Sequence, residues 1–391
     1  MASTAKHDWP MVRLGDVCEI SAGGTPKRSV SSYFNGEIPW VKIGDMEASP
    51  LVTCTEETIT HLGLQESSAK LWPAGTILLS IFATVGRVAV LGVEAASNQA
   101  IAGLRIVDER VDRHYLVHYL RSLEKQLKHK GRGVAQNNVN LKLLRELEIP
   151  LPPLDEQRRI AAILDELVAL ITKIDVEMSV LQKVQHSRLN EVLRHCPQVP
   201  LKTYVESIQS GRSVKEASTD EVRNRVLKIS AVTSGSFEPG ESKPLPDDYA
   251  PADAHQVQKG DVLVSRANTA ELVGASALVV DEVKNLYLPD KLWRLNLAQG
   301  AQAAAIVGIL QSATVRSRIS AKASGSGGSM KNITQKAFLQ VLVPQLGTGE
   351  QERLSRFLML IGSVRELLLQ KRLLLEALSL SLSTRAFQGE L

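Results

Sequence analysis

Two long stretches of the 391-residue sequence carry apolar side chains at alternating intervals of four and three residues, and this rhythm constrains the fold more than any other feature. One apolar residue about every 3.5 positions is the pattern of a coiled-coil seam. In residues 155–193 the seam consists of Ile160, Leu164, Leu167, Ile171, Ile174, Met178 and Leu181. Near the C-terminus it consists of Phe357, Ile361, Val364, Leu368, Leu375, Leu378 and Leu382, with Lys371 in the one gap.

The flanking prolines predict where the first of these helices begins and ends. Pro152 and Pro153 precede it and Pro197 follows it, and Asp155 is placed to cap its first turn. A helix of about 40 residues is about 60 Å long, which is longer than a compact domain usually needs. One such helix alone would most often belong to the core of a helical bundle. Two of them, each closing an equivalent half of the chain, favour a spacer or a docking surface.

The two halves of the chain are copies of one unit. Asn138 and Asn332 lie 194 residues apart, and so do Gln157 and Gln351. Residues 73–80 and 258–265 are each a glycine turn that leads into a short apolar strand, and a second apolar strand containing glycine follows each one. We therefore expect an α+β fold with an internal repeat: mixed α/β domains at residues 1–154 and 197–347, and long helices at residues 155–196 and 348–391. Shorter helices are expected near residues 114–130 and 301–323.

Composition is typical of a cytoplasmic protein and excludes several classes. The formal net charge is only +4, which permits a nucleic-acid partner without requiring one. Cys18, Cys54 and Cys196 are isolated thiols that fit neither a disulfide framework nor paired metal spacing. The first ten residues lack the apolar core of a signal peptide, and charged residues interrupt every candidate membrane span. We expect no membrane association.

Positive charge gathers in two matching places. Residues 121–145 contain seven Lys and Arg against one acid, and residues 312–336 contain five and no acid. Two separated basic stretches suggest two contacts with one polyanion, although each alone could be a solvated helix face. A glycine-rich segment lies inside each stretch, at residues 131–133 and 325–329. It is either a flexible connection or a loop whose backbone approaches phosphates closely.

Motifs for catalysis are absent from the sequence. It contains no phosphate-binding P-loop, no dinucleotide-binding glycine motif, no His-Glu-x-x-His and no Asn/Asp-Pro-Pro-aromatic run. One nuclease-like set exists, Glu282 and Lys284 with Asp261 upstream, and two acids with a lysine could hold Mg²⁺. The first half has no equivalent, which favours charged residues at a strand end over a nuclease site. We expect no metal site.

The constellation indicates a bivalent DNA-binding protein in which each globule contacts one segment of a duplex. Phosphate contacts would supply affinity, and Arg, Lys, Asn and Gln reaching base edges would supply sequence choice. The candidates are Lys27, Arg28, Lys42, Arg87, Gln99, Arg132, Gln136 and Asn137 in the first half, and Arg212, Lys215, Lys228, Arg266, Asn268, Lys331 and Asn332 in the second. A scaffold that binds only proteins is the alternative, and it would show no salt-dependent affinity for a duplex.

Three segments resemble the specificity subunits of type I restriction–modification systems. They are residues 150–161 (Pro-Leu-Pro-Pro-Leu-Asp-Glu-Gln-Arg-Arg-Ile-Ala) before the first long helix, the opening residues 14–17 and 21–26, and the closing residues 386–391. The resemblance covers both copies. It implies two target-recognition domains that each recognise half of a split DNA site, and long antiparallel helices that set the spacing. The family's proline-and-Glu-Gln junction falls on Pro152, Pro153, Glu156 and Gln157, whereas the second copy has one proline, Pro344.

The resemblance also assigns the chemistry to other chains. It implies that this chain is not an enzyme and binds no cofactor, and that its long helices dock two methyltransferase subunits, with restriction subunits joining the complex. S-adenosylmethionine, ATP and Mg²⁺ would be used by these partners. A specificity subunit that serves a fused methyltransferase–nuclease is a close alternative. The remaining alternative is that the chain is itself an autonomous nuclease or methyltransferase.

Overall fold

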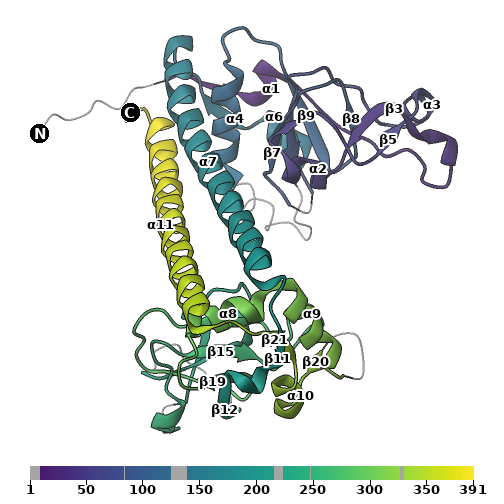
Figure 1. Ribbon diagram of the computed structural model, residues 1–391. Helices are drawn as coiled ribbons and strands as arrows, with labels where there is room; N and C mark the ends of the chain where they lie inside the picture. Colours follow the sequence, from purple (N-terminus) through teal and green to yellow (C-terminus); the bar gives the residue numbers. More distant parts are fainter. Residues whose placement is uncertain (1–8, 83, 125–138, 215–222, 247, 326–329) are drawn as a thin grey trace, which may run out of the picture. The chain divides into compact units, whose positions relative to one another are not determined.

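The computed structural model describes residues 9–82, 84–124, 139–214, 223–246, 248–325 and 330–391. The chain divides into two compact units: unit 1 consists of Met1–Ile174 with Lys371–Leu391, and unit 2 of Asp175–Gln370. Sequence alone placed the domain boundaries at the ends of the long helices. In the structure each unit instead combines one globule with part of both long helices, α7 (Leu154–Leu193) and α11 (Thr348–Ala386), which are labelled in Figure 1.

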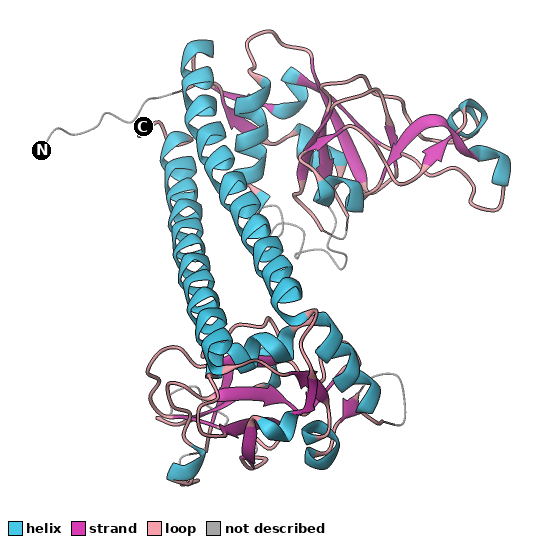
Figure 2. Ribbon diagram, in the orientation of Figure 1, coloured by secondary structure: helices cyan, strands magenta, loops and turns pink. Residues whose placement is uncertain are grey.

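Unit 1 is a mixed globule, and its strands in the described ranges form three sheets (Figure 2). A five-stranded sheet has the order β2-β9-β6-β7-β4, a three-stranded sheet has the order β5-β3-β8, and β1 pairs with β10. Its elements are β1 (Met11–Arg13), α1 (Leu14–Val17), β2 (Cys18–Ala22), η1 (Ser31–Tyr33), β3 (Phe34–Val41), α2 (Ile43–Ala48), β4 (Leu51–Val52), β5 (Thr58–Ile59), α3 (His61–Gln65), β6 (Ile77–Ser80), β7 (Val88–Leu91), β8 (Ala96–Ser97), β9 (Ile101–Ile106), α4 (Arg113–Ser122), α6 (Leu141–Arg145) and β10 (Glu148–Pro150).

The described strands of unit 2 form four sheets, of orders β12-β19-β15-β17, β14-β13-β18, β11-β21 and β16-β20. Its elements are β11 (Gln198–Pro200), η2 (Leu201–Thr203), β12 (Val205–Ser210), β13 (Arg225–Leu227), η3 (Ile229–Val232), β14 (Ser242–Pro244), η4 (Asp253–His255), β15 (Val262–Ser265), β16 (Ala267–Asn268), β17 (Ser276–Leu278), β18 (Leu286–Tyr287), β19 (Leu292–Leu297), α8 (Ala303–Gln311), α9 (Ala313–Lys322), β20 (Lys331–Asn332), α10 (Gln335–Leu339) and β21 (Leu342–Pro344).

The predicted repeat is confirmed strand by strand. The order β2-β9-β6-β7 in unit 1 matches β12-β19-β15-β17 in unit 2, and the parallel pair β3/β8 matches β13/β18. The apolar runs that follow the two glycine turns are β6 and β15, and every residue of both is buried. Alternate side chains of each strand enter two different apolar clusters, so both faces are covered. Gly75 and Gly260 in these turns have φ of +87° and +90°, a backbone conformation that glycine adopts without strain.

One expected element differs from the sequence-based prediction. The helix expected near residues 301–323 is two helices, α8 and α9, because Ser312 between them has extended backbone angles (φ −62°, ψ 141°). The polar Ser312 thus interrupts an apolar run that the pattern alone would continue.

A buried glutamine ties the start of α7 to the globule of unit 1. Gln157 is fully buried, and its Oε1 accepts a hydrogen bond from the backbone N–H of Asp112 at 2.8 Å. Its Nε2 donates to the carbonyl oxygens of Arg110 and Pro152, both at 2.8 Å. Asp112 is the N-cap of α4, where its carboxylate accepts from the N–H of Tyr115. One side chain therefore holds the entry to α7 and the start of α4 together.

The equivalent glutamine does the same in unit 2. Gln351 is 6 % exposed, its Oε1 accepts from the N–H of Gln302, the N-cap of α8, at 3.1 Å, and its Nε2 donates to the carbonyl of Leu346 at 3.0 Å. Tyr204 supports this junction, because its hydroxyl donates to the carbonyl of Pro344 and accepts from the N–H of Leu346. The second junction has a single proline and retains two of the three hydrogen bonds, those to the helix N-cap and to the chain before the long helix.

The long helices run antiparallel, and each unit shows this independently. In unit 1, residues early in α7 (Ile160, Leu164 and Leu167) form one buried cluster with Leu375, Leu382 and Ala386, which are late in α11. In unit 2, residues late in α7 (Leu189 and Leu193) share a cluster with Leu354, Phe357 and Leu358, which are early in α11. The α7 residues Ile171, Met178 and Leu181 are half-buried and Ile174 is buried, as the spacing predicts.

The predicted seam of α11 is wrong at two positions. Val364 is 36 % exposed and Leu378 is 45 % exposed, so neither is a buried pairing residue. Ile361, Leu368, Leu375 and Leu382 recur every seven residues and are buried or half-buried. A second set of half-buried residues, Arg365, Arg372 and Ser379, lies four residues after Ile361, Leu368 and Leu375. The sequence pattern predicts the second set three residues after them. Because these three side chains are polar, a search for apolar spacing does not detect them. Leucines lie on several sides of α11, so an incorrect set of positions also showed regular spacing.

The two units differ in how a globular helix, α4 in unit 1 and α8 in unit 2, contacts a long helix. In unit 1, His114 Nδ1 and His118 Nε2 of α4 each lie 2.8 Å from a carboxylate oxygen of Asp165 on α7. Burial lowers the pKa of His118. Burial of Asp165 acts to raise its pKa, but hydrogen bonds from both histidines outweigh this and lower the pKa. In unit 2 a Cβ on Gly308 of α8 would lie 2.5 Å from Leu358 Cδ1, so that contact is apolar and close.

The C-terminal segment belongs to unit 1. Ala386 is fully buried, and the Phe387 ring makes edge contacts with Tyr115 and Tyr119 of α4, at centroid distances of 5.5 and 5.1 Å. α11 ends at Ala386, so the last five residues expected in the helix form a separate tail. No helix in the described ranges combines the length and apolar character needed to cross a membrane.

We predict that Gln157→Met destabilises unit 1. The change keeps the side chain's volume but leaves one buried N–H and two carbonyls without their partner, which costs about 2 kcal/mol or more and lowers the midpoint of thermal unfolding by about 4–8 °C. Gln65→Met is the control, because Gln65 is exposed at the end of α3. Differential scanning calorimetry measures both, and an equal loss in the two variants would contradict the role of Gln157.

Candidate nucleic-acid interface

Two of the candidate cations in unit 1 are already paired with acids. Arg28 forms an ion pair with Glu57, and its guanidinium lies 4.8 Å and 4.9 Å from the ring centroids of Phe34 and Trp40. The Lys42 ammonium lies 2.7 Å from Glu56 and 2.9 Å from Glu57. Hydrogen bonds to Glu56 and Glu57 raise the pKa of Lys42 to about 12. Hydrogen bonds from Arg28 and, to a smaller extent, from Lys42 lower the pKa of Glu57. Two acids thus offset the two cations, which leaves little net attraction for phosphate.

The other candidates on unit 1 differ in how free they are. Lys27 is exposed and forms no ion pair with any residue that the structure describes. Arg87 lies 3.7 Å from Glu47 with half of its side chain exposed. Gln99 accepts a hydrogen bond from the Thr25 hydroxyl. Lys27 is therefore the candidate in this unit whose charge is most available to a polyanion.

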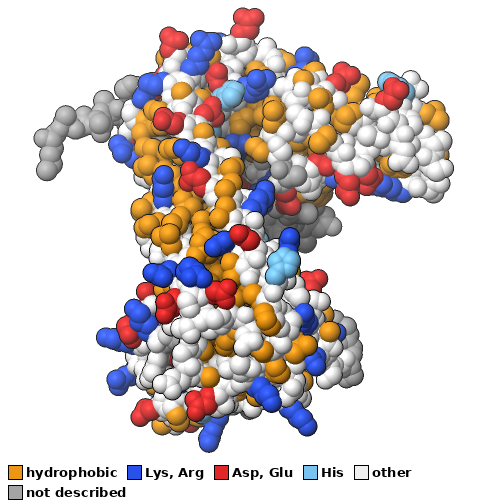
Figure 3. Space-filling model, viewed as in Figure 1, with side chains coloured by type: hydrophobic (Ala, Val, Ile, Leu, Met, Phe, Trp, Pro, Cys, Tyr) orange, Lys and Arg blue, Asp and Glu red, His pale blue; other side chains and the backbone are white. Residues whose placement is uncertain are grey.

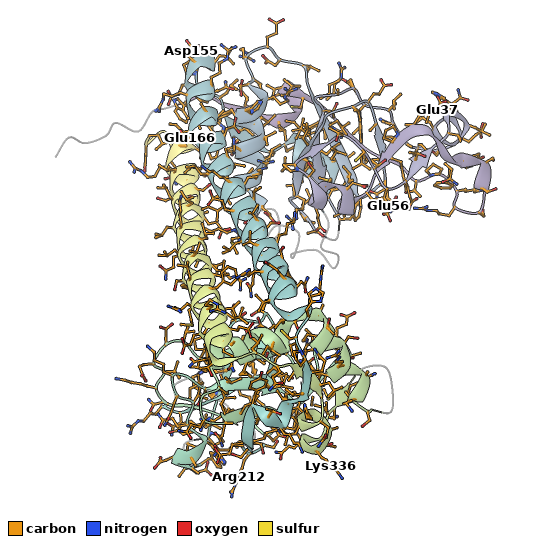
Figure 4. The ribbon with its side chains drawn as sticks, viewed as in Figure 1. Glu37, Glu56, Asp155, Glu166, Arg212 and Lys336 are labelled. Atoms are coloured by element: carbon orange, nitrogen blue, oxygen red, sulfur yellow. The ribbon has the colours of Figure 1, made fainter. Side chains whose placement is uncertain are left out.

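Unit 2 presents unpaired cations on its surface. Arg212 and Lys228 are exposed, and within the described part of the chain neither has an ion-pair partner. Figure 4 shows Arg212, and Lys336 from the second basic stretch, projecting from unit 2 into solvent. Such side chains can reach a phosphate without breaking an internal contact.

Three candidates in unit 2 are brought together by a short strand pair. Asn268 of β16 lies opposite Lys331 of β20, and Ala267 lies opposite Asn332. The backbone of Asn332 also exchanges two hydrogen bonds with Ser324, at 2.8 and 2.9 Å. Asn268, Lys331 and Asn332 thus share one edge of unit 2, although they come from segments more than 60 residues apart.

Several basic residues support the fold instead of facing solvent. Arg266, a candidate, donates from Nε to the carbonyl of Asp290 at 2.9 Å. Arg316 donates to the carbonyls of Val273 and Glu271, and Arg318 donates to the carbonyl of Leu342. Two of the five basic residues in residues 312–336, Arg316 and Arg318, therefore donate hydrogen bonds to backbone carbonyls. A basic face that only binds a polyanion would not need these hydrogen bonds. Arg132, Gln136, Asn137 and Lys215 lie outside the described residues.

A basic cavity in unit 2 was not predicted. Arg223 and Lys284 line a hollow of about 280 Å³ together with Arg225 and Asn285, and no acid lines it among the described residues. The alternation of Arg223 and Arg225 at the start of β13 was the available signal. Lys284 had been considered only as part of a nuclease-like set, and its cationic surroundings suit an anion better.

The structure argues against the nuclease alternative, because Asp261 is already paired within unit 2. The Asp261 carboxylate lies 2.9 Å from Arg294 Nη2, with both side chains largely buried, and it accepts from the N–H of Gln258 at 2.8 Å. Burial raises the pKa of Asp261. This carboxylate is committed to the fold of unit 2. Among the described residues no group of three or more His, Cys, Asp or Glu is arranged to hold a metal ion.

Exposed apolar side chains follow the outer faces of the long helices. In unit 2 the α11 residues Leu360 and Leu367 are 64 % and 66 % exposed, and Val176, Val180 and Val184 repeat every four residues on α7. In unit 1 the α11 residues Leu373 and Leu374 are 64 % and 72 % exposed. Figure 3 shows hydrophobic side chains gathered along these helices. Contiguous exposed apolar surface of this kind marks a protein–protein contact.

Comparison with known proteins gives a consistent result. Residues 6–179 match the family described as type I restriction modification DNA specificity domain. The chain is 28 % identical over 282 residues to the type I restriction enzyme MjaVIII specificity subunit of Methanocaldococcus jannaschii, covering 66 % of this chain and 64 % of that one. It is 34 % identical over 170 residues to the EcoR124I/EcoR124II specificity subunit of Escherichia coli, covering 41 % of each. The chain spans about half the length of the curated relatives it matches.

Two solved structures share the fold along nearly the whole chain. The type I restriction–modification S subunit from M. genitalium aligns over 99 % of both chains with a TM-score of 0.59 and 12 % identity. A chain from a study of complex assembly and conformational transition of the type I R-M system aligns over 98 % of both, with a TM-score of 0.58 and 19 % identity. Residues 6–179 are therefore similar to the type I restriction modification DNA specificity domain, and the chain shares the fold of these two solved structures.

Proposed function

We propose that this chain is the DNA-specificity subunit of a type I restriction–modification complex and that it recognises a bipartite DNA site. The observation that carries the proposal is the repeated unit: two globules with the same strand order, the first of which matches the specificity-domain family. Each globule would recognise one half of the site. The curated relatives, which are specificity subunits, support this role.

The candidate residues fall into two groups, one that would supply affinity for DNA and one that would select the sequence. Exposed, unpaired cations such as Lys27, Arg212 and Lys228 would contact phosphates. Amide side chains at an edge, such as Asn268 and Asn332, are suited to hydrogen bonds with base edges. Arg28 and Lys42 are held by glutamates and would contribute less to affinity than their charge suggests.

The long helices would set the spacing between the half-sites and dock the partner subunits. The exposed leucines and valines of α7 and α11 offer an apolar surface for two methyltransferase subunits. Restriction subunits, or a nuclease fused to the methyltransferase, would join through these partners. We place the complex in the cytoplasm with the DNA it modifies.

The chain itself would carry out no reaction. Methyl transfer from S-adenosylmethionine and cleavage driven by ATP with Mg²⁺ would belong to the partner subunits. The commitment of Asp261 to Arg294 supports this division, because the one nuclease-like set in the sequence is left without a free strand-end carboxylate.

An exchange of recognition domains tests the proposal directly. Residues 1–150 are replaced by those of a related subunit with a different site, and methylated bases in the host genome are then sequenced. We expect one half of the recognised site to change and the other half to stay the same. A change in both halves, or in neither, would refute the assignment of one half-site to each globule.

Salt dependence of duplex binding distinguishes free from paired cations. Each lost phosphate contact lowers the slope of log K against log salt by about 0.9. We expect this loss for Lys27→Gln and no measurable change for Arg28→Gln, because Glu57 already pairs with Arg28. Fluorescence anisotropy with a labelled duplex at several salt concentrations measures both slopes. The same loss in the two neighbouring variants would show that the glutamates do not neutralise this surface.

Docking is tested on the exposed leucines. Leu367→Asp and Leu374→Asp should abolish co-purification with the methyltransferase while changing the thermal midpoint by no more than about 2 °C, since exposed substitutions usually change stability by less than about 0.5 kcal/mol. Gln370→Asp, on the same helix and also exposed, is the control and should assemble normally. Assembly by both leucine variants would exclude this surface as the docking site.

A further inference from the structure

A polar cavity of about 200 Å³ lies inside unit 2, where the long helices meet the globule. Helices α7, α8, α9 and α11 and the strand β17, all labelled in Figure 1 except β17, contribute to its wall. The side chains that matter here are Gln185, His186, Ser276, Gln311, Arg316 and Arg365. None of the proposed DNA contacts lines it.

Two guanidinium groups on this wall have only neutral partners in the described structure. Arg365 donates from Nη2 to Gln185 Oε1 at 2.7 Å and from Nη1 to the Ser236 hydroxyl at 3.4 Å. Arg316 donates to the carbonyls of Val273 and Glu271. Both side chains are partly buried, and within the described ranges neither forms an ion pair. Burial lowers the pKa of Arg316.

A third group on the wall lacks a partner altogether. Ser276 is 1 % exposed, and its hydroxyl has no hydrogen-bond partner in the described structure. A buried hydroxyl left unsatisfied costs about 1–3 kcal/mol, so such a group calls for an explanation. Gln311 beside it is fixed by hydrogen bonds from Nε2 to the carbonyls of Gly235 and Ser276, at 2.6 and 2.9 Å.

No acidic residue lines the cavity among those described, so its charge is positive and uncompensated. We propose that this cavity is a binding site for a small oxyanion of phosphate chemistry, held by Arg365 and Arg316 with the Ser276 hydroxyl as an additional donor. Its volume is below the 300–1,000 Å³ of sites for drug-sized ligands, which suits a single phosphate group.

Because the wall draws on both long helices and on the globule, the anion would link three separate segments of unit 2. Its binding would stabilise unit 2 by mass action, since it binds the folded chain. The proposal does not depend on the DNA-binding role, because the site shares no residue with the proposed DNA contacts.

The test uses inorganic phosphate as the probe and the 391-residue chain as the protein. Thermal unfolding and calorimetric titration are measured with phosphate and with chloride at equal ionic strength. We expect phosphate to raise the midpoint in a saturable way and chloride to leave it unchanged. Equal shifts with the two salts would overturn the site.

Variants locate the site within the cavity. Arg365→Gln should reduce phosphate affinity by about tenfold or more, as expected for the loss of a charged hydrogen bond. Arg356→Gln is the matched control, because it removes the same charge from the exposed face of the same helix. Equal losses of affinity in the two arginine variants would indicate a general charge effect and overturn the proposal.

Ser276→Ala keeps the proposal testable if Arg365→Gln fails to fold. Removing an unpaired hydroxyl should leave the phosphate-free chain at least as stable as the parent, while phosphate affinity falls about tenfold. A variant less stable without phosphate and unchanged in phosphate affinity would show that the hydroxyl serves only the fold.

The natural source of the phosphate is identified by competition. Displacement of bound phosphate by a DNA duplex would indicate the DNA backbone, and displacement by a nucleoside monophosphate would indicate a nucleotide. Displacement by neither would indicate free phosphate. Each of these three results retains the site and names its ligand.

Discussion

The hydrogen bonds of two buried glutamines hold each long helix to its globule. Gln157 and Gln351 each bond to the chain just before the long helix and to the N-cap of the first globular helix that packs beside it. The direction in which α7 and α11 leave the globules therefore depends on one side chain in each copy. Buried backbone groups must be paired, so a substitution at either position leaves several of them unsatisfied at once.

The sequence was most informative where geometry leaves few choices. The strands β6 and β15 could be predicted because a strand covered on both faces is a continuous apolar run, and Gly75 and Gly260 marked turns with positive φ. The second helical seam was harder, because α11 has leucines on several sides. Its pairing face depends on which residues α7 presents, and Arg365 and Arg372 occupy positions that an apolar pattern does not mark.

The candidate site was less predictable than the fold, because the sequence does not show which charged side chain forms an ion pair or hydrogen bond with which other residue. Glu57 is 29 residues from Arg28, and Arg266 donates to a carbonyl 24 residues away. Only the tertiary structure separates Lys27, which is free among the described residues, from its neighbour Arg28. The asymmetric contacts of α4 and α8, polar through Asp165 in one unit and apolar at Gly308 in the other, likewise arise from the local packing of each copy.

The interleaved composition of the units has a consequence for synthesis on the ribosome. Unit 2 is complete in sequence once Gln370 has emerged, but unit 1 also needs Lys371–Leu391, which supply the buried Ala386 and the Phe387 ring beside Tyr115. Domains usually fold in the order in which they are translated. Here the globule made first keeps an apolar surface uncovered until residues 371–391 have emerged, so unit 1 finishes folding after unit 2.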